Sequence, residues 1–152
     1  MITIGDILSP KHILLGLEAG THAQAIAKVA ELLESDSHVV DWERLETGLL
    51  AGSSCMSGDS GSGLCIAHVR TDAVNGMIMA AGRSAEGIPT ADGTRVRLVF
   101  VIGVPVALAS DYLRIIGALA RIFRTGNGEA ELLAAQSADA FLQTLRTLEM
   151  EM

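Results

Sequence analysis

The segment Gly61-Ser62-Gly63-Leu64-Cys65-Ile66-Ala67-His68 ends in the residue best suited to chemistry, a histidine behind a short apolar run. The run Leu64 to Ile66 follows a Gly/Ser-rich loop and predicts a buried strand. Open α/β sheets commonly carry their chemistry where strands end. A neutral imidazole can act there as a nucleophile, because its reference pKa is about 6.5. The competing interpretation is a structural histidine that is partly buried and has its hydrogen-bonding groups satisfied.

A thiol–imidazole pair and a metal centre are the other chemistries to weigh for this segment. Cys65 and His68 lie three residues apart, so a strand directs their side chains to opposite faces and leaves the thiol inert in the core. Cys55 and Cys65 are too few for a disulfide framework, and their spacing matches no zinc pattern. No second His, Cys or carboxylate cluster lies near His68 in the sequence. Neither a metal nor another cofactor is therefore expected.

The composition favours a single domain over residues 1–152 with an aliphatic core. Hydrophobic residues make up 49% of the chain but aromatic residues only 3%, which suits helices packed on a sheet. The net charge of −7 argues against a nucleic-acid partner, which needs clustered Lys and Arg, and allows a basic protein partner. No signal peptide and no membrane-spanning run are visible, so we expect a cytoplasmic protein without direct membrane insertion.

Periodicity predicts alternating strands and helices around the candidate histidine. Helix starts are indicated by the Thr21/Gln24 capping box, and by Asp41, Ser110 and Ser137 as N-caps. The predicted strands cover residues 13–17, 64–66, 77–81 and 96–102, and the predicted helices 21–33, 41–50, 110–123 and 137–148. Residues 51–63 are expected to form a loop, and turns are expected at 86–89 and 92–93. Together these elements predict an α/β fold in which a mixed β-sheet is flanked by helices.

The ordered motifs resemble the enzyme IIA domains of the bacterial sugar phosphotransferase system, fructose–mannitol class, which includes the nitrogen-regulatory IIA proteins. That family's central pattern is Ser-Thr-Gly-Ile-Gly-x-Gly-Ile-Ala-Ile-Pro-His, and its ungapped counterpart here spans residues 57–68. The identical positions are Ser57, Gly61, Gly63, Ile66 and His68. Further along the chain, residues 92–100 resemble the family's Asp-Gly-x-Pro-Val-x-Leu-Val-Phe. The resemblance covers essentially the whole chain.

Four positions depart from the family pattern. Gly52 and Ser53 stand where the family usually has an Arg-Glu pair, and Ala67 replaces the proline before the histidine. Tyr112 replaces a second histidine that precedes the leucine at Leu113. The phosphoacceptor position is therefore retained while positions that support it are changed.

The resemblance implies that His68 accepts a phosphoryl group from phospho-HPr and passes it on or signals with it. We expect a stand-alone regulator of the nitrogen-regulatory type, and a sugar-specific role stays open. Donors must surround the transferred group, and the natural ones are the Ser57 hydroxyl and the amides of Gly61, Ser62 and Gly63. Arg70 and the Tyr112 hydroxyl are further candidate donors. The implied partners are an HPr-like phosphodonor and a regulated protein or permease domain, and the sequence leaves homo-oligomerisation open.

Each of these assignments has a structural alternative. Tyr112 is equally a core or interface aromatic residue, Arg70 a solvated surface charge, and the Gly/Ser loop merely flexible. The alternative for the whole protein is an IIA-fold binding module that regulates partners without carrying phosphate.

Overall fold

A computed structural model describes residues 2–57, 63–91, 93–124 and 127–151, with residues 56 and 57 described by their backbone. The helices are α1 (Ile4–Ile7), α2 (His22–Ala30), α3 (Trp42–Ala51), α4 (Ala109–Arg124), α5 (Gly128–Ala134) and α6 (Ala138–Met150). Short 3-10 turns are η1 (Pro10–His12), η2 (Glu31–Leu33) and η3 (Val106–Leu108). The strands are β1 (Ile13–Leu14), β2 (Ser53–Ser57), β3 (Gly63–Arg70), β4 (Ile78–Pro89) and β5 (Arg95–Val104).

The strands form one mixed sheet in the order β1-β4-β5-β3-β2, with β5 at its centre. β3 and β5 are parallel, whereas β2 and β4 run antiparallel to their neighbours β3 and β5. Every residue of β5 from Leu98 to Val104 is buried, as its unbroken apolar run predicts for a strand covered on both faces. The predicted α/β class with helices on a mixed sheet is confirmed.

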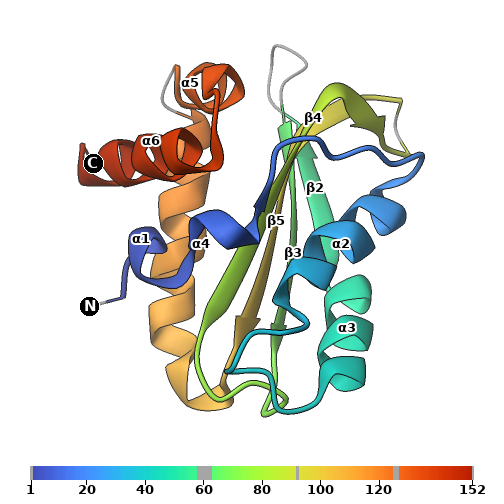
Figure 1. The fold of residues 1–152 in the computed structure, drawn as a ribbon, viewed down its shortest axis with the longest axis vertical. Helices are drawn as coiled ribbons and strands as arrows, with labels where there is room; N and C mark the ends of the chain where they lie inside the picture. The colour runs from blue at the N-terminus through green and yellow to red at the C-terminus, as the bar shows by residue number, and fades with distance from the viewer. Residues whose placement is uncertain (1, 58–62, 92, 125–126, 152) are drawn as a thin grey trace.

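Helices cover both faces of the sheet and create two cores (Figure 1). α2 and α3 bury Val29, Leu45 and Leu49 against one face, and α4 and α6 bury Leu119 and Phe141 against the other. Side chains of β3 alternate between them, so Leu64 and Ile66 join the α4 side while Cys65 and Ala67 join the α2–α3 side. This alternation directs His68 to the α4 side.

Three of the four predicted helix caps are confirmed. The side-chain oxygens of Thr21, Asp41 and Ser137 accept the backbone N–H three residues on, at 3.2, 3.3 and 3.0 Å. The side-chain oxygen Oε1 of Gln24 accepts a hydrogen bond from the backbone N–H of Gly20 (2.9 Å) instead of from the N–H of the N-cap residue. Ser110 is not a cap, because η3 runs directly into α4 and places Ser110 within the first turn.

Two predicted loops contain strand. Ser53–Ser57, expected in the loop 51–63, forms the antiparallel edge strand β2. Its polar side chains gave no strand pattern in the sequence, but an edge strand accepts polar side chains. β4 extends through the turn expected at 86–89, with an irregularity between Arg83 and Ile88 that Gly87 accommodates at φ +84°. Conversely, only Ile13 and Leu14 of the strand expected at 13–17 pair with β4.

Candidate functional site

His68 lies near the carboxyl end of β3, paired in register with Ile102 of β5. Since β3 and β5 are parallel, their carboxyl ends meet at the same edge of the sheet. On the other side, His68 N–H donates to the carbonyl of Gly52 (3.3 Å), at the junction of α3 and β2. The backbone of the histidine is therefore held between two neighbouring strands.

The His68 ring packs against Tyr112, with ring centroids 5.0 Å apart and planes tilted by 38°. Tyr112 belongs to the first turn of α4, which follows β5 through η3. Arg70 is exposed two residues beyond His68, on the same face of β3, and its positive charge acts on the Tyr112 hydroxyl. The structure therefore brings three of the predicted site residues together, His68, Arg70 and Tyr112.

Burial sets the protonation states of the aromatic pair. Removal of the ring from water lowers the pKa of His68 below its usual 6.5, so the imidazole is neutral at neutral pH. Burial raises the pKa of Tyr112 above its usual 10.0, against the opposing charge of Arg70, so its hydroxyl keeps a proton to donate. The Nδ1 atom of His68 is buried and has no hydrogen-bond partner among the described residues. A histidine nucleophile commonly has its other ring nitrogen held by an acceptor, which fixes the tautomer, and the described part of the chain supplies none.

Of the glycine-rich motif, the residues that the structure describes lie at the opposite end of β3. Gly63 opens the strand and pairs with Ser57 of β2. His68 lies five positions beyond Gly63 along the extended strand, which is roughly 16 Å at about 3.3 Å per position. β3 therefore does not bring Gly63 or Ser57 to the His68 ring. Gly61 and Ser62 lie outside the described residues.

Gly52 is a site residue that the sequence showed only as a departure from the family pattern. A Cβ atom at this position would lie 2.3 Å from the carbonyl oxygen of His68 and 3.2 Å from that of Gly48. No side chain fits in that gap, so glycine is what permits the end of α3 to approach β3 at the histidine. The available signal was its position directly after a predicted helix, where glycine commonly ends helices.

Residues 6–147 match the family model described as phosphoenolpyruvate-dependent sugar phosphotransferase system, EIIA 2. The chain belongs to this family. It is 34% identical over 128 residues to the fructose-specific EIIA component of the PTS system of Haloferax volcanii, a match that covers 82% of this chain and 83% of the relative. It is also 25% identical to a nitrogen regulatory protein of Pseudomonas aeruginosa, over 94% of each chain.

A solved structure of the nitrogen regulatory protein IIA-Ntr from Neisseria meningitidis has the same fold as this EIIA 2 protein. The TM-score is 0.80 at 26% sequence identity, and the match covers 93% of this chain and 98% of that one. The resemblance to the fructose–mannitol and nitrogen-regulatory IIA proteins is thereby confirmed.

The two cysteines of this EIIA 2 protein are not free thiols, contrary to the expectation for Cys65. Cys55 of β2 and Cys65 of β3 are directly opposed in the strand register and form a disulfide. The expected orientation is confirmed, because Cys65 is fully buried on the α2–α3 side, across the sheet from His68. The expectation failed because it treated residue 55 as part of a loop, whereas β2 places it beside Cys65.

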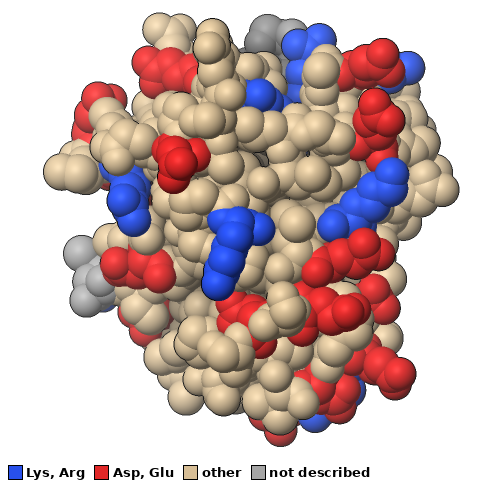
Figure 2. Space-filling view, viewed as in Figure 1, with Lys and Arg blue, Asp and Glu red and all other residues tan. Residues whose placement is uncertain are grey.

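The charges of the EIIA 2 protein offer no broad basic surface on the face drawn in Figure 2, where Lys and Arg side chains are separated by neutral and acidic atoms. Among the described residues, no group of three or more His, Cys, Asp or Glu side chains could hold a metal ion. No helix within the described ranges is long and apolar enough to cross a membrane.

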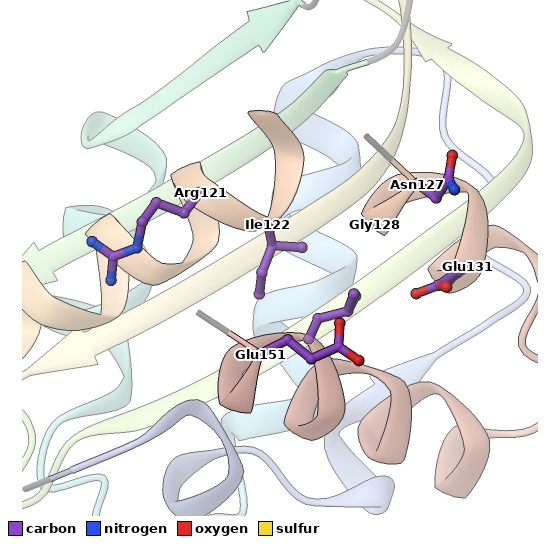
Figure 3. Close-up of a pocket in the computed structure, with 7 residues that line it drawn as sticks. Arg121, Ile122, Asn127, Gly128, Glu131 and Glu151 are labelled. Carbon is purple, nitrogen blue, oxygen red and sulfur yellow. The ribbon is translucent and has the colours of Figure 1, made fainter. Parts of the chain in front are cut away.

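A separate hollow of ≈ 730 Å³ lies where α4 ends against α5 and α6 (Figure 3). Its lining residues are Arg121, Ile122, Asn127, Gly128, Glu131, Leu148 and Glu151. Arg121 is nine residues beyond Tyr112 along α4, a rise of roughly 13 Å. The hollow offers no nucleophilic imidazole or thiol among these residues, and it is distinct from the His68 site.

Proposed function

We propose that residues 1–152 form a single EIIA 2 domain that acts as a phosphocarrier, with His68 as the phosphoacceptor. The observation that carries the proposal is the half-buried, neutral imidazole held against Tyr112 where the parallel strands β3 and β5 end. The phosphodonor would be an HPr-like protein, and the acceptor a permease domain or a regulated protein.

Attack on the phosphorus atom would come from Nε2 of His68. Nδ1 is buried, so a phosphoryl group cannot approach it without movement of the surrounding chain. In the transfer, a bond forms from Nε2 to phosphorus and the bond from phosphorus to the donor's histidine breaks, leaving the donor imidazole with the electron pair. The neutral state of His68 supplies the lone pair that this step requires.

The transferred group carries negative charge that the site must stabilise. The Tyr112 hydroxyl supplies a neutral donor and Arg70 a positive charge near it. A neutral hydrogen bond is roughly half as strong as a charge-assisted one. Because Tyr112 and Gly52 occupy positions where the family usually has charged or ionisable groups, we expect slower transfer than in family members that retain them.

The surface beside Tyr112 supports docking of a protein donor. Val106 of η3 and Leu113 of α4 are 62% and 67% exposed, so apolar side chains flank the site. The net charge of −7 would steer a basic donor toward it, with an association rate that falls as salt is added. The experiment that tests the function is incubation with phosphoenolpyruvate, enzyme I and HPr, followed by mass spectrometry of the intact protein. We expect one acid-labile, base-stable phosphate on His68, and absence of an adduct under conditions that label another EIIA 2 protein would refute the assignment.

A second function, an EIIA 2 fold that binds partners without carrying phosphate, is favoured by the changed positions around the histidine. Arg70 is the one cation that the described contacts connect to the His68–Tyr112 pair. This function would be supported if His68→Ala left partner binding unchanged and the parent protein took up no phosphate.

The destination of the phosphoryl group is a further part of the proposal. The Haloferax relative is named as a fructose-specific component, and the Pseudomonas and Neisseria relatives as nitrogen regulatory proteins. We propose the regulatory role. It predicts that the phosphorylated protein retains its label when mixed with a fructose-type IIB domain, and rapid transfer to that domain would assign a transport role instead.

Changes at Tyr112 test how the site stabilises the transferred charge. Tyr112→Phe keeps the ring against His68 but removes the hydroxyl, so we expect phosphate uptake to slow by about 3- to 10-fold, the cost of one neutral hydrogen bond. Tyr112→His supplies a second imidazole, and we expect uptake faster than in the parent. Single-turnover rates with phospho-HPr measure both effects. A Tyr112→Phe rate equal to that of the parent would show that the hydroxyl plays no part.

The lowered pKa of His68 predicts the pH dependence of phosphate uptake. An ordinary histidine loses its lone pair as pH falls through about 6.5. Because burial lowers the pKa of His68, its lone pair persists at that pH and is lost only at lower pH. The fall in uptake rate should therefore set in at a lower pH than it would for an ordinary histidine. NMR titration of the His68 ring provides an independent check, and a pKa at or above the reference value would contradict the burial seen in the structure.

A further inference from the structure

The phosphate transfer proposed for His68 does not use the Cys55–Cys65 disulfide as a reacting group, and the position of the bond suggests a function of its own. It joins directly opposed residues of β2 and β3, and β2 is the last strand in the sheet order. Cys55 is half-buried whereas Cys65 is 0% exposed, in the same core as Leu45 and Leu49 of α3. One sulfur of the bond therefore belongs to a half-buried residue of an edge strand, and the other to a fully buried residue of an interior strand.

We propose that Cys55–Cys65 is a reversible thiol–disulfide site for a small thiol of the glutathione class. In the oxidised state the bond fastens β2 to β3 three residues before His68, and in the reduced state β2 is no longer fastened. The proposal does not depend on phosphate transfer by His68.

The difference in burial determines the order of the exchange. The thiolate of the small thiol attacks Sγ of Cys55, the less buried of the two residues, and the electron pair of the broken S–S bond goes to Sγ of Cys65, which takes up a proton. A second small thiol then attacks the mixed disulfide and releases the Cys55 thiol together with the oxidised small thiol. Two electrons pass from two small thiols to the protein. In the reverse direction Cys55 attacks the oxidised small thiol and Cys65 resolves the mixed disulfide.

Few other side chains hold the edge strand. Of the β2 side chains that the structure describes, those of Ser53, Ser54 and Cys55, only Cys55 packs against a core. In the described part of the chain, the other attachments of β2 are the backbone ladder from Ser53↔Ala67 to Ser57↔Gly63, His68 N–H to Gly52 O, and the Ser53 hydroxyl, which donates to Leu50 O. Edge segments with few buried apolar contacts open at low free-energy cost. Reduction should therefore loosen β2 and the hydrogen bond at His68 without unfolding the rest.

The test is a redox titration of the intact folded protein in mixtures of reduced and oxidised glutathione. Samples are quenched with acid, alkylated and weighed as intact protein, with far-UV circular dichroism recorded in parallel. We expect reversible conversion between a form without free thiols and a form with two, at unchanged secondary structure. Amide hydrogen exchange of β2 and of His68 should be at least about tenfold faster in the reduced form, whereas α2 and α6 should exchange equally in both.

Two single variants test the order of attack. In Cys65→Ser, incubated with oxidised glutathione alone, the remaining Cys55 should take up one glutathione, because neither a second cysteine nor a free small thiol is present to resolve the mixed disulfide. In Cys55→Ser the fully buried Cys65 should take up none. The proposal would be overturned if the disulfide resisted excess glutathione until urea unfolded the protein. It would also be overturned if amide hydrogen exchange were equally fast in both redox forms, or if the two variants took up glutathione equally.

Discussion

Replacing His68 by glutamine is expected to abolish phosphate uptake, with a fall in rate of at least about 1000-fold, because the variant lacks the nucleophile. The glutamine side chain replaces the imidazole by a polar amide of similar reach, so the variant should fold although the ring contact with Tyr112 is lost. The measurement is intact-mass phosphorylation with phosphoenolpyruvate, enzyme I and HPr, sampled over time and supported by the melting temperature of each protein.

The matched control is His38→Gln, on the α2–α3 side of the molecule. The His38 side chain is 51% exposed and its Nδ1 lies 2.8 Å from Asp36 Oδ1, so its replacement removes an exposed histidine without touching the site. Uptake by this control should equal that of the parent. Full phosphorylation of the His68→Gln protein would show that another histidine is the phosphoacceptor. Fragmentation in the mass spectrometer would then locate the phosphate.

The sequence predicted the fold correctly in the segments where burial and hydrophobic periodicity agree. β5 is apolar without a break from Leu98 to Ile102 because it lies at the centre of the sheet, covered on both faces. Three helix starts were predicted correctly from their caps, Thr21, Asp41 and Ser137, because a cap is a local interaction between residues three positions apart. The orientation of Cys65 away from His68 followed from the two-residue period of a strand.

The parts that the sequence did not reveal depend on contacts between distant segments. β2 carries serines and no apolar alternation, so only its pairing with β3 makes it a strand. The Cys55–Cys65 bond depends on that same pairing. The ring contact between His68 and Tyr112 joins residues from β3 and α4, and no local pattern encodes it.

Gly52→Ala is expected to destabilise the protein and to impair the site together. The added Cβ would lie 2.3 Å from the His68 carbonyl oxygen, a backbone atom, so either the end of α3 or β3 must move. Overpacking of this kind costs about 1–3 kcal/mol, which corresponds to a fall in melting temperature of roughly 3 to 10 °C. Displacement of β3 would also disturb the ring contact with Tyr112, so we expect phosphate uptake to fall by about tenfold, in keeping with the sensitivity of transfer to small misplacements.

Gly16→Ala is the matched control, since a Cβ at that position meets no atom within 4 Å. This substitution should leave the melting temperature unchanged or slightly raised, because alanine restricts the unfolded chain more than glycine does. Equal stability of the two variants would show that α3 can withdraw from β3 at no cost. In that case the residue at position 52 would not constrain His68, and an arginine could be introduced there to supply the charge that the family usually has at this position.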